Sequence, residues 1–167
     1  MSEKKRLIVA GYGRHGKDTF CEMLREIANY TFTTSSFVAS QIVFDEIGGA
    51  YGYKNAPDCW EDRANHRAEW YEIITKYNTP DKSRLGRRIF EGFPVYCGIR
   101  NFDEFNALKE RGLFDLSVWI DASLRMPPEA GSSMTVRRED CDIVVDNNGG
   151  LEELERRARY FCREHLS

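Results

Sequence analysis

The chain has 167 residues, enough for one domain with a core of its own. Hydrophobic residues make up 41% and charged residues 31% of it, a balance that excludes an intrinsically disordered protein. The net charge of −3 gives no overall basic field of the kind that drives non-specific nucleic-acid binding. The apolar run 7–10 is too short for a signal sequence or a membrane span, so we expect a cytoplasmic monomer or homodimer with no membrane partner.

Strands and helices are predicted to alternate along the chain, which favours a three-layer α/β sandwich with a mostly parallel five-stranded sheet. The strands are expected at about 6–10, 30–36, 94–100, 114–123 and 142–149. The helices are expected at about 17–29, 37–47, 58–78, 81–92, 102–111 and 151–165. The second helix should stop at Gly48-Gly49, and the third should begin at Pro57-Asp58.

A glycine-rich loop follows the first strand and reads GYGRHGKDTF over residues 11–20. Its Gly-x4-Gly-Lys spacing is that of a phosphate-binding loop (P-loop), in which glycines let backbone N–H groups converge on an anion. The helix that follows adds its positive N-terminal end, and the lysine adds a charge for the β- and γ-phosphates. The loop therefore predicts ATP binding by Gly11, Gly13, Arg14, His15, Gly16, Lys17, Asp18 and Thr19, with His15 at the loop surface.

Asp18 stands where many such loops have a serine or threonine, and the hydroxyl comes one residue later, at Thr19. Three roles for Asp18 remain open. It holds Mg²⁺ through water, it accepts a hydrogen bond from the acceptor or from Arg100, or it is an ordinary carboxylate favoured by the helix dipole.

Four segments together resemble a known family: AGYGRHGKDTF, SSFVAS, GIRNFDEFNAL and DIVVDNNGGLEELE. They are similar, in this order, to segments of the phage-type deoxynucleoside monophosphate kinases of the P-loop kinase superfamily. The resemblance implies a P-loop nucleotide kinase fold, ATP and Mg²⁺ as cofactors, a deoxynucleoside monophosphate as acceptor, and the cytoplasm of a phage-infected bacterium. A related phage branch phosphorylates hydroxymethylated pyrimidines within DNA, so DNA is the alternative acceptor.

The chain departs from that family in two respects. It leaves little room for a separate lid domain, and the strand that often ends in an acidic residue reads Cys97-Gly98-Ile99-Arg100 here. Asp18 and Asp121 are the carboxylates that replace it as candidates for the metal site, together with the Thr19 hydroxyl. Arg100 and Arg125 are expected at the transferring phosphoryl group, with Arg125 closing over the triphosphate, and Asn147 is expected at the nucleotide.

The acceptor site is expected at a helical insert of about 50–92 within a single domain, 1–167. Arg63, Arg67 and Tyr71 share one face of the predicted helix 58–78, where two guanidinium groups suit a phosphate and a phenol suits a base. An ordinary solvated face is the alternative. Arg84 belongs to a second basic cluster.

Two serines, Ser35 and Ser36, follow the second strand, where they bind the acceptor or cap the next helix. The sequence contains no nucleophile triad, and phosphoryl transfer needs none. A P-loop ATPase or nucleotide-binding switch is a more distant alternative, because it requires a clear acidic metal ligand on the central strand. Five dispersed cysteines favour neither a disulfide framework nor a zinc site, and we expect them as small buried side chains: Cys21, Cys59, Cys97, Cys141 and Cys162.

Overall fold

A five-stranded sheet forms the centre of the computed structural model, which describes residues 3–129 and 134–167. The strands lie in the order β2-β3-β1-β4-β5, and each pairs in parallel with its neighbours. Their bounds are β1 Leu7–Ala10, β2 Phe32–Thr34, β3 Val95–Cys97, β4 Leu116–Asp121 and β5 Ile143–Asp146. The predicted fold class is confirmed, and the sheet is parallel throughout rather than mostly so.

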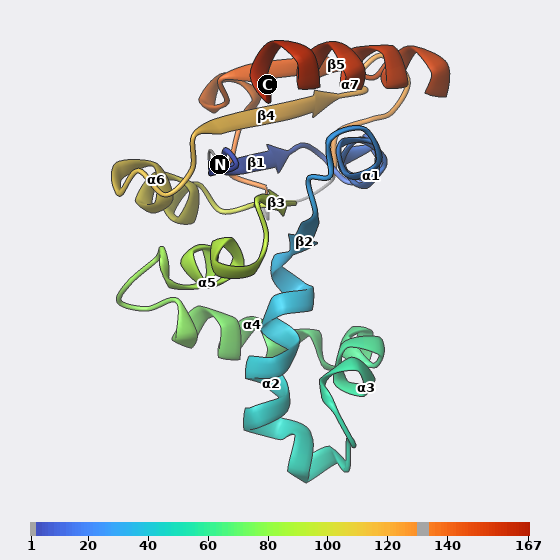
Figure 1. Cartoon of the computed structure of the whole chain (residues 1–167). Coiled ribbons are helices and arrows are strands. Elements are labelled where there is room, and N and C mark those ends of the chain that lie inside the picture. The colour runs from blue at the N-terminus through green and yellow to red at the C-terminus, as the bar shows by residue number, and fades with distance from the viewer. Residues whose placement is uncertain (1–2, 130–133) are drawn as a thin grey trace.

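Helices cover both faces of the sheet and give the molecule three layers (Figure 1). Helices α1 and α7 pack on one face, and α5 and α6 pack on the other. The helix bounds are α1 Lys17–Ala28, α2 Ser35–Tyr51, α3 Ala56–Glu61, α4 Arg67–Tyr77, α5 Arg84–Gly92, α6 Phe102–Glu110 and α7 Leu151–His165, with short 3₁₀ turns η1 Arg63–His66 and η2 Arg138–Asp140. The last helix has the bounds that the sequence predicted.

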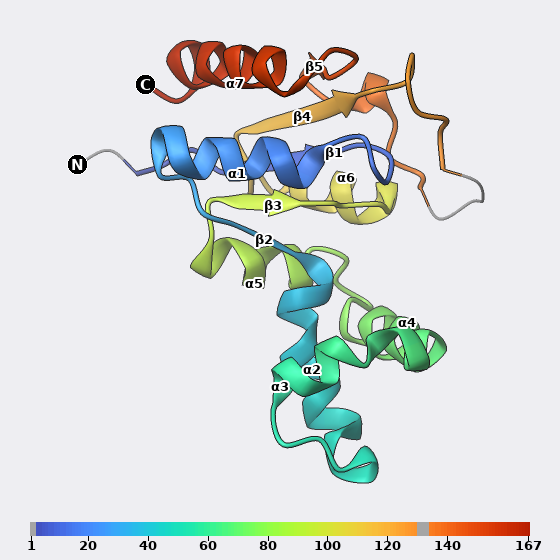
Figure 2. The ribbon, with the colours of Figure 1, turned by 90° about the vertical axis from the view of Figure 1, so that its right-hand side faces the viewer.

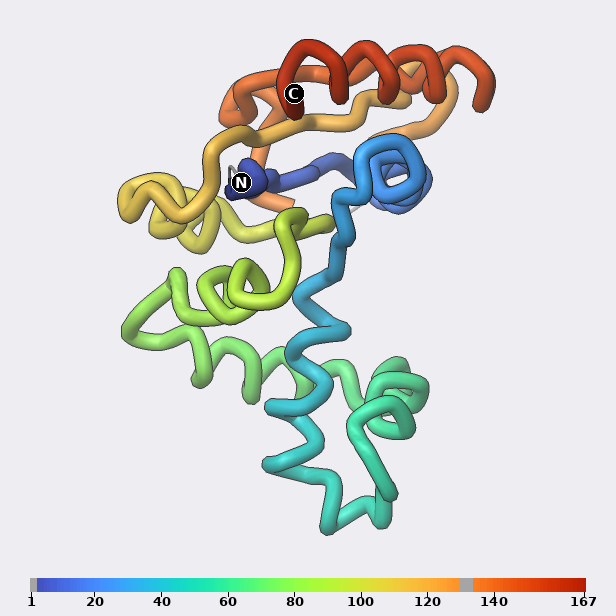
Figure 3. The backbone as a smooth tube through the Cα atoms, viewed as in Figure 1, coloured from blue at the N-terminus to red at the C-terminus, as the bar shows by residue number. Residues whose placement is uncertain are grey.

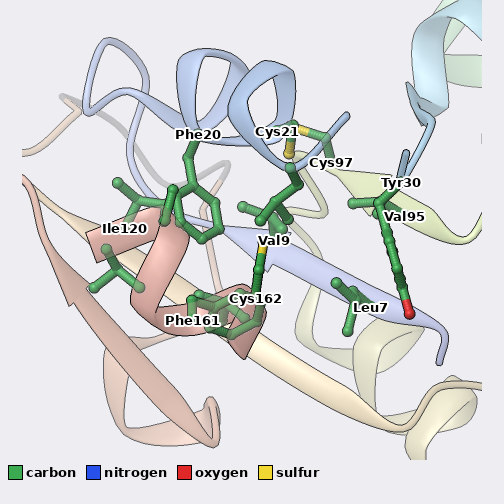
Figure 4. Packing of buried hydrophobic residues seen from close by; sticks show 14 of the residues in the cluster. Leu7, Val9, Phe20, Cys21, Tyr30, Val95, Cys97, Ile120, Phe161 and Cys162 are labelled. Atoms are coloured by element: carbon green, nitrogen blue, oxygen red, sulfur yellow. The ribbon is translucent and has the colours of Figure 1, made fainter. Parts of the chain in front are cut away.

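Alternate residues of the strands supply the two cores, because successive side chains of a strand point to opposite faces. Val9 of β1 packs with Phe20 of α1 and Phe161 of α7, whereas Ile8 packs with the other face (Figure 4). All of these side chains are fully or almost fully buried. The buried strands therefore read as continuous apolar runs, as expected of a parallel sheet covered on both sides.

A helical projection leaves the sheet at β2 and returns at α5 (Figures 2 and 3). Helix α2 is its axis, and α3 and α4 pack against α2 around a small core of Val43, Cys59 and Trp70. None of the helices among residues 3–129 and 134–167 is long and apolar enough to cross a membrane.

Helix α2 is longer at both ends than the sequence predicted. It begins at Ser35, where the Thr34 hydroxyl accepts a hydrogen bond from the Phe37 N–H (3.3 Å), so β2 is shortened to three residues. It does not stop at Gly48-Gly49 but at Gly52, whose positive φ of 71° suits a helix C-terminus. Gly48 serves packing instead, since a Cβ there would lie 2.6 Å from the Phe44 ring.

The single helix predicted over 58–78 is wrong. The chain forms α3, then the turn η1, then α4. Asp62 accounts for the break, because its carboxylate accepts hydrogen bonds from the Asn65 amide (2.5 Å) and the Tyr53 hydroxyl and so holds the chain in a tighter turn. Side chains before and after Asp62 consequently do not share one helical face.

Candidate phosphate-binding site

The loop between β1 and α1 lies at the edge of the sheet where the parallel strands end, which is where α/β proteins bind ligands. Gly11 has a φ of 151°, and a Cβ there would lie 2.7 Å from the carbonyl oxygen of Ile120 in β4. Gly16, with a φ of 99°, precedes the first turn of α1 and touches the Asn147 amide. Two glycines of the predicted motif are thus required by backbone conformation and close approach.

His15 is fully buried, so its predicted place at the loop surface is wrong. Its Nδ1 accepts a hydrogen bond from the Ala122 N–H (3.0 Å), and its Nε2 lies 3.2 Å from the Pro127 carbonyl oxygen, to which it donates. The imidazole ties the loop to the chain after β4. Since both ring nitrogens are occupied, the side chain supports the loop and does not reach a ligand.

Asn147 supports the same loop from the chain after β5. Its amide donates to the carbonyl oxygen of His15 (2.9 Å), and the side chain is buried. Its own carbonyl oxygen accepts a hydrogen bond from Arg125 Nε (2.7 Å), and the rest of the Arg125 side chain is exposed. The structure therefore brings Arg125 and Asn147 together, with Arg125 available to a ligand and Asn147 engaged with the protein.

Lys17, the first residue of α1, turns back over the loop, and its Nζ donates to the Tyr12 carbonyl oxygen (3.0 Å). Desolvation lowers the pKa of this amine, and the neighbouring Arg100 lowers it further, while Cys97, Asp18 and Glu129 act in the opposite direction. A partly desolvated lysine between loop and arginine is a suitable charge for a phosphate.

Asp18 points toward the end of β3, the strand in which the sequence resemblance led us to expect an acidic residue. Its Oδ1 accepts a hydrogen bond from the thiol of Cys97 (3.3 Å), so α1 brings a carboxylate to that strand end. Figure 4 shows the side chains of Cys97 and of Cys21 in α1 close to one another. A carboxylate therefore lies at this strand end, and its role at a metal stays a prediction.

The donor atoms at this position fit Mg²⁺. Asp18 and Thr19 are both exposed, and Mg²⁺ in kinases is typically held by one or two protein oxygens together with water and phosphate oxygens. Asp121, the other predicted ligand, is already engaged: its carboxylate accepts from the Ser123 N–H (2.9 Å) and lies 3.2 Å from Arg138. Burial alone would raise the pKa of Asp121, but these two partners hold it below its usual value.

Arg100 and the loop backbone together form an anion site, and the carboxylate of Glu129 occupies it. Glu129 Oε1 accepts hydrogen bonds from the Gly13 N–H (2.5 Å) and from Arg100 Nη2 (2.8 Å). Glu129 Oε2 accepts from Arg100 Nη1 (2.5 Å). Sequence reasoning identified Gly13 and Arg100 but missed Glu129, which lies over a hundred positions from the loop and carries no local motif beyond the preceding Pro127-Pro128.

The predicted acceptor residues of the helical projection do not converge. Arg63 lies over the Trp60 ring at 3.9 Å and donates to the Trp60 carbonyl oxygen (2.8 Å). Arg84 lies over the Tyr77 ring, also at 3.9 Å. Arg67 is exposed and Tyr71 is 73% exposed, so the shared helical face predicted for Arg63, Arg67 and Tyr71 is absent from the described residues.

A polar network lies nearer the sheet edge, at the start of α2. The Tyr96 hydroxyl of β3 donates to the Glu104 carboxylate of α6 (2.8 Å), and Ser35 also hydrogen-bonds Tyr96. Glu104 is half-buried as a residue, but its carboxylate is withdrawn from water, and this desolvation raises its pKa to about 7. Ser36 is engaged with Thr34 (3.2 Å between the hydroxyl oxygens), and Thr34 rather than Ser36 caps α2. No local sequence pattern points to Glu104, because its environment is assembled from three separate elements.

Comparisons with known proteins bear on the fold. No family model matches the chain, and a search of curated proteins finds no match. Among solved structures, the protein TT1252 from Thermus thermophilus is similar at 16% identity with a TM-score of 0.56, over 99% of this chain and 100% of that one. Shikimate kinase from Aquifex aeolicus has 17% identity and a TM-score of 0.47, over 95% and 98% of the two chains. A gluconokinase from Sinorhizobium meliloti has 15% identity and a TM-score of 0.49, over 94% and 90%. Identity at this level indicates a shared fold and nothing further.

Proposed function

We propose that this protein is a P-loop kinase that transfers the γ-phosphoryl group of ATP to a deoxynucleoside monophosphate. The observation that carries the proposal is the anion site at the loop. The Gly13 N–H and the Arg100 guanidinium converge on one carboxylate, with Lys17 close by, in the arrangement that a phosphate group requires.

The donor side of the reaction uses the loop and its surroundings. The backbone N–H groups of the loop and Lys17 hold the β- and γ-phosphates, and Arg125 lies beside the place expected for the rest of the nucleotide. Bound Mg²⁺, with Asp18 and Thr19 as the protein donors, supplies further neutralisation of phosphate charge. Placement and charge neutralisation supply most of the catalysis in phosphoryl transfer, so no covalent intermediate with the protein is needed.

The acceptor side is proposed along the neighbouring strand ends. Ser35 at the start of α2 places a hydroxyl group near the end of the strand that leads into Arg100, beside the buried Tyr96–Glu104 pair of β3 and α6. An acceptor held there presents its phosphate to Arg100. The helical projection with Arg63 and Arg67 closes the acceptor side in this proposal, although its arginines must turn from their present partners to reach a ligand.

The test is an acceptor panel. The protein is incubated with radiolabelled ATP, Mg²⁺ and each deoxynucleoside monophosphate in turn, beside hydroxymethylated duplex and single-stranded DNA. We expect label in a deoxynucleoside diphosphate and ADP formation that depends on the acceptor. Label in DNA would contradict the proposal and indicate a kinase that acts on bases within DNA. ADP formation without any acceptor would contradict it and indicate an ATPase.

A further inference from the structure

Glu129 makes contacts that a phosphate would otherwise make. Its two oxygens accept three hydrogen bonds, one from the Gly13 N–H and two from the Arg100 guanidinium. Its side chain is only 24% exposed. The hydrogen bonds with Arg100, and after them the one with Gly13 and the charge of Lys17, lower the pKa of Glu129 to about 2. The carboxylate is therefore charged at every physiological pH.

A phosphate and this carboxylate cannot share the position. A Cβ built on Gly13 would lie 2.6 Å from Glu129 Oε1, which shows how closely the carboxylate approaches the loop backbone. The single N–H of Gly13 makes one strong hydrogen bond, and the paired N–H groups of Arg100 face both oxygens of Glu129. An incoming anion must displace Glu129 before it can occupy these donors.

We propose that Glu129 is an internal competitor of the P-loop: its displacement costs every phosphate ligand the same free energy, so a single phosphate binds weakly, whereas a polyphosphate, which makes further contacts, still binds. The inference rests on the proposed function and extends it to the choice of ligand. A monophosphate that displaces Glu129 forms about the same hydrogen bonds with Gly13 and Arg100 as the carboxylate did. Its net binding free energy at these donors is therefore small. A polyphosphate also reaches Lys17 and the N-terminal N–H groups of α1, which Glu129 does not contact, so it gains enough to displace the carboxylate.

The same exchange sets the state of Arg100. While Glu129 holds the guanidinium, Arg100 faces the loop as one half of an ion pair. Once a polyphosphate takes the position, the guanidinium is free to bind phosphoryl oxygens. The apparent affinity for any loop ligand is reduced by the fraction of molecules in which Glu129 occupies the site.

The test compares the affinities of the wild-type protein, Glu129→Ala and Glu129→Gln for three probes by isothermal titration calorimetry: inorganic phosphate, pyrophosphate, and ATP with Mg²⁺. We expect both variants to bind pyrophosphate about tenfold or more tightly than the wild type, and to gain binding of inorganic phosphate, because the competitor has lost its charge. Glu139→Ala, in the exposed turn η2, changes the net charge equally and should leave all three affinities as in the wild type.

Two other outcomes count against the inference, and they are distinguishable. If the wild type binds ATP and both variants bind phosphate and pyrophosphate with wild-type affinity, the competitor role is wrong while the proposed function stands. If no protein binds ATP or pyrophosphate, the proposed function fails, and this inference fails with it. Circular dichroism of each variant establishes that it is folded.

Discussion

The phosphate-binding loop and the helical projection differ in how their charged side chains are held. At the loop, the Gly13 N–H and the Arg100 guanidinium face one anion position, and Lys17 lies close by with its Nζ on the Tyr12 carbonyl oxygen. In the projection and at its return into α5, Arg63 and Arg84 each lie over an aromatic ring a few residues earlier in the chain, Trp60 and Tyr77, and face no common point. A short motif that bridges a strand and a helix thus predicts which side chains the fold brings together, whereas an array of charges along a presumed helix does not.

The largest expected effect tests the loop itself. Lys17→Ala should lower kcat by about 10²- to 10³-fold, because it removes a charge fixed beside the transferring phosphoryl group. Initial-rate measurements with ATP and the best acceptor check this, and the melting temperature should be unchanged. Lys76→Ala, in the exposed last turn of α4, is the matched control and should keep the wild-type rate. Near-full activity of Lys17→Ala would remove the basis for a P-loop.

The next prediction compares one histidine from each region. His15→Ala should lower the free energy of unfolding by about 2–4 kcal/mol, because it leaves the Ala122 N–H and the Pro127 carbonyl without their partner. His66→Ala, in the projection, should cost under about 1 kcal/mol, because His66 pairs with half-exposed carboxylates. Urea denaturation measures both. Equal effects would show that the loop is no more firmly held than the projection.

Asp18→Asn should lower kcat about tenfold and leave the KM for ATP nearly unchanged, since the charge matters most while phosphoryl charge is moving. Steady-state kinetics over a series of Mg²⁺ concentrations check this, and calorimetric titration of Mg²⁺-dependent ATP binding gives a second readout. Cys97→Ser, which keeps a hydrogen-bond donor to Asp18, should resemble the wild type. An unchanged kcat in Asp18→Asn would show that Asp18 has no role in catalysis and is an ordinary carboxylate at the start of a helix.

Glu104, which lies in α6 and accepts a hydrogen bond from Tyr96 of β3, makes stability depend on pH. Its pKa of about 7 in the folded protein exceeds the value of about 4.3 in an unfolded chain. The contribution of the neutral Glu104 carboxyl group to stability is therefore complete at pH values below the pKa in the unfolded chain. It is lost as the pH rises through the pKa in the folded protein. Glu104→Gln does not titrate, so we expect the wild type to lose about 2–3 kcal/mol relative to this variant between pH 5 and pH 8. Urea denaturation measures the free energy of unfolding of both proteins at each pH. If the two free energies change in parallel with pH, Glu104 is not desolvated.

The smallest effect is expected in the projection. Arg63→Ala and Arg67→Ala should each raise the KM for the acceptor by up to about tenfold, the equivalent of one modest charge-assisted hydrogen bond, with the KM for ATP unchanged. Arg156→Ala on α7 is the matched control. If neither variant alters the acceptor KM, the acceptor site lies wholly at the sheet edge, around Ser35 and Glu104.

Sequence reasoning predicted what depends on local pattern. The five parallel strands, the loop spacing and the bounds of α7 all follow from apolar periodicity and glycine placement. It failed where long-range contacts decide the outcome. Burial of His15 depends on the chain after β4, and the break in the 58–78 helix depends on contacts of Asp62 with Tyr53 and Asn65. The role of Glu129 could not be predicted from the sequence, because its partners come together only in the folded chain.

The supports of the loop also determine when it can form. His15 is held by Ala122, more than a hundred residues later in the chain, and its carbonyl oxygen is held by Asn147. During synthesis, the glycine motif leaves the ribosome early but finds these partners only after β4 and β5 have followed. The nucleotide binding proposed above therefore becomes possible only late in synthesis, and a nascent chain that stops before β5 should contain the motif but lack the binding.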